Sequence, residues 1–121
     1  MADKAPRVFI VEDEFLVAFE MADTLEDMGI PVAGPYVHFE EAETAAREEP
    51  IDAGLLDVNL GGGQTSEPIA AILRERGVPF VFITAYDRKE ITFLLSDDRV
   101  VRKPITPDVL IETLREVCPG L

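Results

Sequence analysis

The sequence predicts an α/β fold in which five parallel strands form one doubly wound sheet with helices on both faces. Two observations favour this fold. Along the whole chain, short apolar runs alternate with stretches in which apolar residues recur at helical spacing. Several of the apolar runs also end directly on polar residues, which is typical of parallel strands whose carboxyl ends carry a functional site. The length of 121 residues suits one domain.

The first half of the chain contains two predicted pairs of a strand and a helix. Residues 8–11 are a continuous apolar run, and residues 18–28 carry apolar side chains at helical spacing until Gly29 supplies a stop signal. Residues 32–33 form a short apolar pair between two prolines. Because proline cannot donate a ladder hydrogen bond, we expect this second strand at the edge of the sheet. A second helix is predicted over residues 39–49.

A third strand is predicted over residues 53–57, an apolar run that ends on Asp57 and is followed by a glycine-rich turn. The next helix begins at a Thr-Ser pair, either member of which can cap it. Residues 80–83 are a second continuous apolar run, of the kind that a central parallel strand needs, and Thr84 follows them. Asp57 and Thr84 are therefore expected at the same edge of the sheet.

The last third of the chain has weaker patterns. Residues 87–96 show little helical periodicity, so we expect a short or mobile fourth helix there. Residues 100–101 predict a brief fifth strand, with Lys103 just beyond its end. Thr106 is expected to cap a final helix that has Pro107 at its first position.

Composition excludes several classes of function. The chain has 24 acidic residues against 11 Lys and Arg, a formal net charge of −13, which repels phosphate backbones and anionic headgroups. Direct binding to nucleic acid is therefore not expected. The apolar run at residues 8–11 is too short for a signal peptide or a membrane span, which predicts a cytoplasmic protein without membrane attachment.

Five polar residues are expected along the carboxyl edge of the sheet. They are Glu12, Asp13, Asp57, Thr84 and Lys103. A cluster of carboxylates suits Mg²⁺, and an ionised aspartate near a metal, a hydroxyl and an ammonium can attack phosphorus to form an aspartyl phosphate. Taken singly, each residue has a purely structural explanation, such as a cap or turn for Asp57. The five together favour a phosphoryl-transfer site.

At these positions the chain resembles the receiver domain of two-component response regulators, and the resemblance spans essentially its full length. It implies a flavodoxin-like (βα)5 fold with strand order 2-1-3-4-5, and one receiver domain over residues 1–121 with no output domain. The matched residues are Glu12-Asp13, Asp57, Thr84-Ala85 and Lys103-Pro104.

The resemblance also implies a role for each matched residue. Asp57 is the expected phospho-acceptor. Asp13 is expected to bind Mg²⁺ directly and Glu12 to bind it through water, while Asn59 offers its backbone carbonyl. The remaining two residues are expected to contact the phosphoryl oxygens: Thr84 and Lys103. In this family the peptide bond between this lysine and the proline that follows it is usually cis. The sequence alone leaves both isomers of the Lys103–Pro104 bond open.

Two departures from the family pattern concern its conformational switch. Val100 stands where the family usually has an aromatic switch residue. Residues 82–86 instead resemble a receiver subgroup with a Phe-x-Thr-x-Tyr signature, in which Tyr86 is the candidate that couples phosphorylation to a surface change. The expected switch residues are Thr84, Tyr86, Lys103 and Pro104.

The resemblance predicts a signalling protein that turns over no external substrate. Its phosphoryl donor is expected to be a sensor histidine kinase or a phosphotransfer protein. Downstream, it is expected either to bind a partner protein through the fourth helix, fifth strand and fifth helix, or to act as a phosphate sink.

Two other classes of protein share parts of this pattern. An aspartate-nucleophile, Mg²⁺-dependent phosphohydrolase needs a second acid two residues after the nucleophile, where this chain has Asn59, which cannot donate a carboxyl proton. A flavodoxin-like cofactor binder needs a phosphate-binding loop after the first strand. Here residues 12–14 are all acidic and would repel phosphate.

Overall fold

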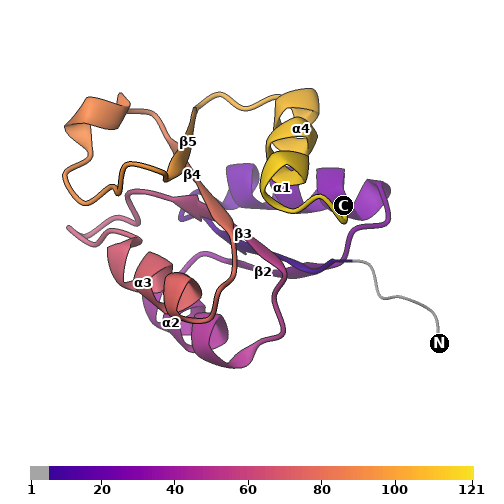
Figure 1. The fold of residues 1–121 in the computed structure, drawn as a ribbon, viewed down its shortest axis with the longest axis horizontal. Helices are drawn as coiled ribbons and strands as arrows, with labels where there is room; N and C mark the ends of the chain where they lie inside the picture. Colours follow the sequence, from indigo (N-terminus) through magenta and orange to yellow (C-terminus); the bar gives the residue numbers. More distant parts are fainter. Residues whose placement is uncertain (1–5) are drawn as a thin grey trace.

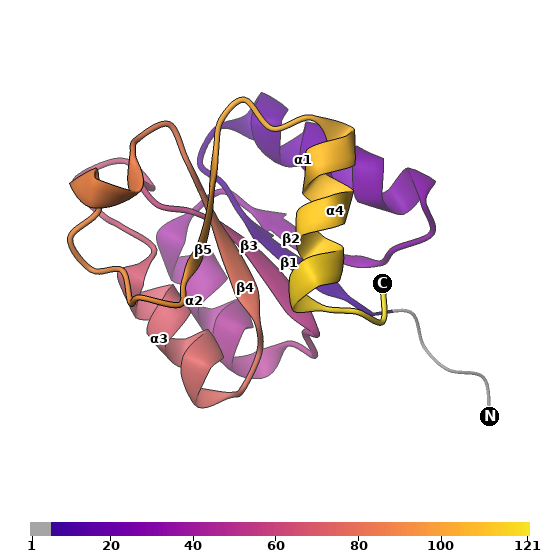
Figure 2. The same cartoon turned by 45° about the horizontal axis from the view of Figure 1, so that its top comes forward.

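A five-stranded parallel sheet forms the centre of the computed structural model, which describes residues 6–121 (Figures 1 and 2). Residues 1–5 of the predicted domain lie outside the described residues. The strand order is β2-β1-β3-β4-β5, as predicted. The strands are β1 (Val8–Val11), β2 (Val32–Tyr36), β3 (Ala53–Asp57), β4 (Phe80–Thr84) and β5 (Arg99–Arg102).

Helices cover both faces of the sheet, which confirms the doubly wound arrangement. One face carries α1 (Phe15–Asp27) and α4 (Pro107–Val117), and the other carries α2 (Phe39–Glu48) and α3 (Glu67–Glu75) (Figures 1 and 2). Successive side chains of a strand point to opposite faces. Leu55 therefore belongs to the apolar cluster under α1 and α4, and Leu56 to the cluster under α2 and α3.

The central strand β3 is buried along its whole length, because both of its faces are covered by helices. Gly54 is needed within it, since a Cβ atom there would lie 3.0 Å from Leu73 Cδ1 and 3.2 Å from Phe80 Cβ. A larger side chain at this position would push α3 away from the sheet. Close packing around Gly54 thus holds β3, and the residues at its carboxyl end, in a fixed place.

Strand β2 lies at the edge of the sheet, as its flanking prolines predicted, but it is longer than expected. It continues to Tyr36 and includes Pro35. Its pairing with β1 is irregular at this point, because Phe9 pairs with Ala33 while Val11 pairs with Tyr36. The irregularity and the open edge together accommodate a residue that has no N–H group to donate.

Local signals account for the boundaries of the final helix. The Thr106 hydroxyl accepts a hydrogen bond from the Val109 N–H at 3.3 Å, and Pro107 occupies the first turn of α4, as predicted. Among the described residues, none of the helices has both the length and the apolar character needed to cross a membrane.

The predicted fourth helix is reduced to one 3-10 turn, η1 (Arg88–Glu90), followed by a segment of turns. Apolar side chains still anchor this segment, because Ile91 is buried and Phe93 packs edge-to-face against Phe82 at 5.6 Å. The Arg88 guanidinium donates hydrogen bonds to three backbone carbonyls further along, those of Leu95, Ser96 and Asp98. Here these carbonyls accept hydrogen bonds from the Arg88 side chain, whereas in a helix they would accept them from backbone N–H groups.

Candidate functional site

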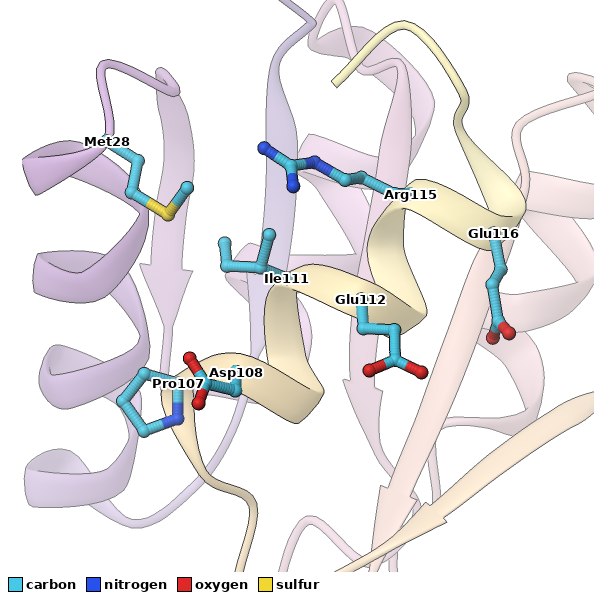
Figure 3. Close-up of a pocket in the computed structure, with 7 residues that line it drawn as sticks. All are labelled: Met28, Pro107, Asp108, Ile111, Glu112, Arg115 and Glu116. Carbon is cyan, nitrogen blue, oxygen red and sulfur yellow. The ribbon is translucent and has the colours of Figure 1, made fainter.

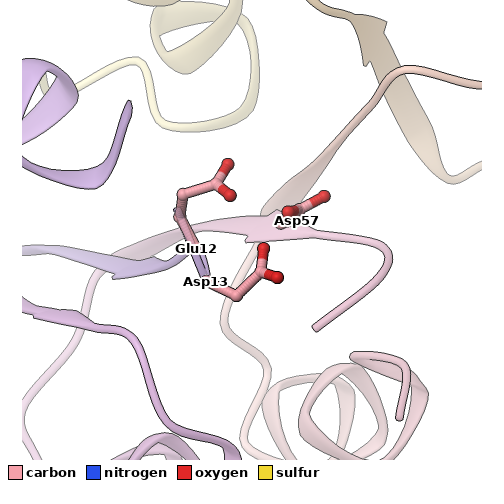
Figure 4. A group of neighbouring side chains, drawn as sticks. All are labelled: Glu12, Asp13 and Asp57. Atoms are coloured by element: carbon pink, nitrogen blue, oxygen red, sulfur yellow. The ribbon is translucent and has the colours of Figure 1, made fainter. Parts of the chain in front are cut away.

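Three carboxylates meet where β1 and β3 end. Val11 pairs with Leu56 in the sheet, so the residues that follow them, Glu12 and Asp57, leave adjacent strands at the same level. One carboxylate oxygen from each of Glu12, Asp13 and Asp57 lies within 4.8 Å of the others (Figure 4). The predicted convergence of these residues on one edge is therefore present in the structure.

Burial makes this carboxylate group electrostatically unfavourable on its own. Glu12 is fully buried and Asp57 is 5% exposed. Burial, together with a hydrogen bond with Glu12 and the charge of Glu12, raises the pKa of the Asp57 carboxyl to about 8, although Lys103 acts in the opposite direction. In the absence of a bound cation, Asp57 therefore tends to hold a proton near neutral pH.

Lys103 brings a positive charge from the end of β5 to the same place. Its Nζ lies 2.8 Å from Glu12 Oε2 and 3.3 Å from Asp57 Oδ2. Burial disfavours the charged ammonium, but the hydrogen bond with Glu12 and the charge of Asp57 outweigh it, so the pKa of Lys103 is raised. The Lys103–Pro104 peptide bond is cis.

Glu14 is a third acidic partner of Lys103 that the sequence did not assign to the site. Its Oε1 lies 3.3 Å from Lys103 Nζ, and its backbone N–H donates to Glu12 Oε1 at 3.1 Å. Unlike Glu12, its side chain is 64% exposed. The sequence signal was present, because Glu14 is the third consecutive acid before the first helix, but only the fold shows which cation it contacts.

Thr84 ends β4 next to Asp57 and is linked to two other predicted switch residues. Its hydroxyl accepts a hydrogen bond from the Tyr86 N–H at 3.0 Å, and its carbonyl accepts one from the Lys103 N–H at 2.7 Å. Thr84 is buried, whereas the Tyr86 side chain is half exposed. A rotation of the Thr84 side chain about its Cα–Cβ bond would move Oγ1 and break its hydrogen bond with Tyr86, whose side chain reaches the surface.

The loop after β3 closes around the carboxylates. Asn59 pairs with Thr65 in an isolated antiparallel bridge, and Gly61 turns the chain with a φ of 79°. A Cβ atom at Gly61 would lie 3.4 Å from Asp13 Oδ2. The role of the Asn59 carbonyl as a metal ligand stays a prediction.

The donor set of this site suits a hard divalent cation. Three carboxylates supply oxygen ligands and an excess of negative charge over the single ammonium of Lys103. Mg²⁺ prefers one or two protein carboxylates together with water and phosphate oxygens. The residues present therefore fit Mg²⁺.

A groove of about 650 Å³ lies elsewhere, between the carboxyl end of α1 and the outer side of α4 (Figure 3). Met28, Ile111 and Arg115 line it together with acidic residues of α4. None of the residues predicted for the phosphoryl-transfer site lines this groove. This groove is therefore separate from the carboxylate group at the carboxyl edge of the sheet.

Comparison with known proteins gives one family match. A family model described as the response regulator receiver domain matches residues 8–115. All five polar residues that converge in the structure lie within this range: Glu12, Asp13, Asp57, Thr84 and Lys103.

Individual relatives agree with this match. The chain is 32% identical over 93 residues to the phyllosphere-induced regulator PhyR of Methylorubrum extorquens, covering 75% of this chain and 35% of PhyR. It is 27% identical over 85 residues to the transcriptional regulatory protein PdtaR of Mycobacterium tuberculosis, covering 70% of this chain and 42% of PdtaR. The chain thus spans less than half the length of either curated relative.

A solved structure matches over nearly the whole chain. The solution structure of SdrG from Sphingomonas melonis Fr1 superposes with a TM-score of 0.81 at 34% sequence identity. The match covers 96% of this chain and 98% of the SdrG chain.

Proposed function

This chain belongs to the family of response regulator receiver domains, and we propose that it accepts a phosphoryl group on Asp57 in a Mg²⁺-dependent reaction. The observation that carries the proposal is the meeting of three carboxylates and one ammonium at the carboxyl edge of the sheet. Receiver domains are signalling modules that receive phosphoryl groups from histidine kinases or phosphotransfer proteins. We propose such a donor here.

Glu12, Asp13 and Asp57 would hold the Mg²⁺ ion, with the Asn59 carbonyl as an additional ligand. Bound Mg²⁺ supplies positive charge that offsets the carboxylates and the phosphoryl oxygens. The residues of the chain prepare the site for this charge, because Glu12 is locked by burial and by the hydrogen bond from the Glu14 N–H. The positive charge of an ion held there would favour the ionised form of Asp57, which is the form that reacts.

In the transfer step, an Asp57 carboxylate oxygen forms a bond to phosphorus while the bond from phosphorus to the donor histidine nitrogen breaks. The electron pair leaves with the imidazole. The Lys103 ammonium, 3.3 Å from Asp57 Oδ2, is placed to offset charge on the transferred phosphoryl group. The Thr84 hydroxyl can donate a hydrogen bond to another phosphoryl oxygen.

Signalling would then begin at Thr84. When the Thr84 side chain rotates toward the phosphoryl group, its Oγ1 moves away from the Tyr86 N–H. The hydrogen bond that this N–H donates to Thr84 in the structure is then broken. The half-exposed Tyr86 ring lines a pocket with residues of η1 and the segment after it, and with Asn59 and Thr65 of the loop after β3. We propose that this contact couples the acceptor to that surface.

An exposed apolar patch beside the site is the proposed docking surface for the phosphoryl donor. It consists of Phe15, Leu16 and Phe19 at the start of α1, which directly follows Glu12 and Asp13. Phe15 and Phe19 stack on one another at 6.3 Å, and Leu16 is 80% exposed. A protein that binds this patch would hold its phosphohistidine close to Asp57.

Leu16→Ser is expected to slow phosphoryl transfer from a histidine kinase about tenfold, because loss of one central apolar contact in an interface weakens binding by about 1.4 kcal/mol. Phosphorylation by acetyl phosphate, which needs no docking, should not change. Met28→Ser, at the opposite end of α1, is the matched control. An equal loss with both donors would contradict the assignment of the patch.

Mg²⁺ is expected to raise the melting temperature, because it binds the folded state and relieves the repulsion among buried carboxylates. At about one hundred times the dissociation constant the stabilisation is about 2.7 kcal/mol. Asp13→Asn should remove most of this gain, whereas Asp27→Asn on the exposed end of α1 should keep it. Thermal melts with Mg²⁺ and with a chelator make the comparison. A full response in Asp13→Asn would refute the metal site.

The proposed function is tested by the intact mass of the protein after incubation with acetyl phosphate, with and without Mg²⁺. An acid-stable, base-labile adduct of about 80 Da that requires Mg²⁺ is expected for an aspartyl phosphate. Absence of an adduct both with acetyl phosphate and with a phosphorylated histidine kinase would refute the proposal.

The phosphohydrolase alternative is not favoured. Asn59 occupies the position where that class places its general acid, and an amide cannot donate a carboxyl proton. The family match covers residues 8–115 and is to the receiver domain.

A further inference from the structure

Glu14 contacts the site in a different way from the other acids. It stands at the N-cap position of α1, yet its side chain makes no capping hydrogen bond and instead reaches Lys103 Nζ at 3.3 Å. It is not one of the three carboxylates grouped closely enough to share a metal ion. Glu14 therefore acts on the ammonium alone, from the solvent side.

The ammonium of Lys103 is already surrounded by anionic oxygens. A lysine ammonium has three N–H groups, and three carboxylates lie within ion-pair distance of it, those of Glu12, Asp57 and Glu14. A phosphoryl group on Asp57 brings further anionic oxygens to the same place. One of the present partners must then give up its contact with Lys103.

Burial decides which partner leaves. Glu12 is fully buried, and its second oxygen already accepts the Glu14 N–H, so it has neither room nor water to move into. Asp57 carries the new group itself. The Glu14 side chain is 64% exposed and can turn into solvent at little cost, because an exposed ion pair contributes little to stability.

We propose that Glu14 is a positioning residue. It contacts the Lys103 ammonium while Asp57 is unphosphorylated and releases this ammonium to the incoming phosphoryl group. The inference rests on the proposed function of Asp57. Its consequence is kinetic: Glu14 competes with the phosphoryl group for Lys103, and its charge at the mouth of the site repels anionic donors. Glu14 thus restrains phosphorylation by small anionic molecules.

The test compares rates of phosphorylation by acetyl phosphate in Mg²⁺ for wild type, Glu14→Gln, Glu14→Asp and Glu26→Gln. In each case an Asp57 oxygen bonds to phosphorus, the bond from phosphorus to the acetyl oxygen breaks, and acetate leaves with the electron pair. Glu26 is exposed on the same helix, about 18 Å further along from a rise of 1.5 Å per residue, and its replacement changes the net charge equally.

Glu14→Gln is expected to react about three to ten times faster than wild type at an ionic strength of about 0.02 M, and the gain should shrink at about 0.5 M because salt screens exposed charges. Glu14→Asp keeps the negative charge but is one methylene too short to reach Lys103 in the same way, so its rate should fall between those of wild type and Glu14→Gln. Glu26→Gln should match wild type at both ionic strengths. A purely structural role of Glu14 would give no such dependence on salt.

The experiment distinguishes failure of the proposed role of Glu14 from failure of the proposed function. A wild type that forms the Mg²⁺-dependent adduct at the same rate as Glu14→Gln, at both ionic strengths, overturns the role of Glu14 and leaves the proposed function standing. A wild type that forms no adduct with any donor overturns both. Melting curves of the variants confirm that each one is folded, as expected for changes at exposed positions.

Discussion

Asp57→Asn is expected to abolish the phosphoryl adduct and, at the same time, to stabilise the protein in the absence of metal. The first effect follows because an amide is not a nucleophile toward phosphorus. The second follows because the variant removes a buried carboxyl whose ionised form burial and the neighbouring Glu12 disfavour. A variant that is more stable but inactive cannot owe its inactivity to misfolding.

The stabilisation should depend on pH in a defined direction. Folding raises the pKa of the Asp57 carboxyl from 3.8 to about 8, so the folded protein binds a proton more tightly than the unfolded chain. The stability that this proton provides is fully present below pH 3.8 and is lost as the pH rises to about 8. The advantage of Asp57→Asn over wild type should therefore grow across this interval.

Thermal melts in a chelator between pH 5 and pH 8.5 measure this difference, and intact mass measures the adduct. Asp97→Asn, at an exposed position, is the control and should resemble wild type in both experiments. An Asp57→Asn protein that still gains a Mg²⁺-dependent adduct would place the acceptor elsewhere.

Lys103→Met is expected to lower both stability and reactivity. Methionine keeps the length and apolar stem of the lysine but leaves Glu12 and Asp57 without their cation. The expected loss of stability is about 2 kcal/mol, below the usual cost of breaking a buried pair because Asp57 can take up a proton. Phosphorylation should slow about a hundredfold, as for removal of one group that stabilises developing charge.

Denaturant unfolding and the rate of adduct formation test this prediction. Lys89→Met, on the exposed turn η1, serves as the control and should leave both quantities unchanged. If Lys103→Met reacted as fast as wild type, the ammonium would have no part in the transfer, and the proposed mechanism would be wrong at this step.

The sheet and most of its helices could be predicted because their signals are local and repeated. Continuous apolar runs such as residues 80–83 mark strands buried on both faces, and Thr106 with Pro107 marks the start of α4. The prediction that β2 lies at the edge of the sheet, which was based on its prolines, is confirmed. The extension of β2 to Tyr36 was not predictable, because it depends on an irregular pairing with β1.

The convergence of the site residues was predictable for the same topological reason. Parallel strands end at one edge, so Glu12 and Asp57 had to be neighbours once β1 and β3 were adjacent. The contact of Glu14 with Lys103 could not be predicted, because it depends on the path of a long exposed side chain across 89 positions of the sequence. Topology determines strand ends, but it does not determine such a path.

The region after β4 could not be predicted, because its backbone carbonyls accept hydrogen bonds from a side chain, whereas in a helix they would accept them from backbone N–H groups. A helix unwinds from its ends, one hydrogen bond after another. The carbonyls of residues 95, 96 and 98 instead share a single guanidinium, that of Arg88. Loss of the Arg88 side chain would therefore leave all three carbonyls without this donor at the same time, so one substitution weakens the whole segment at once.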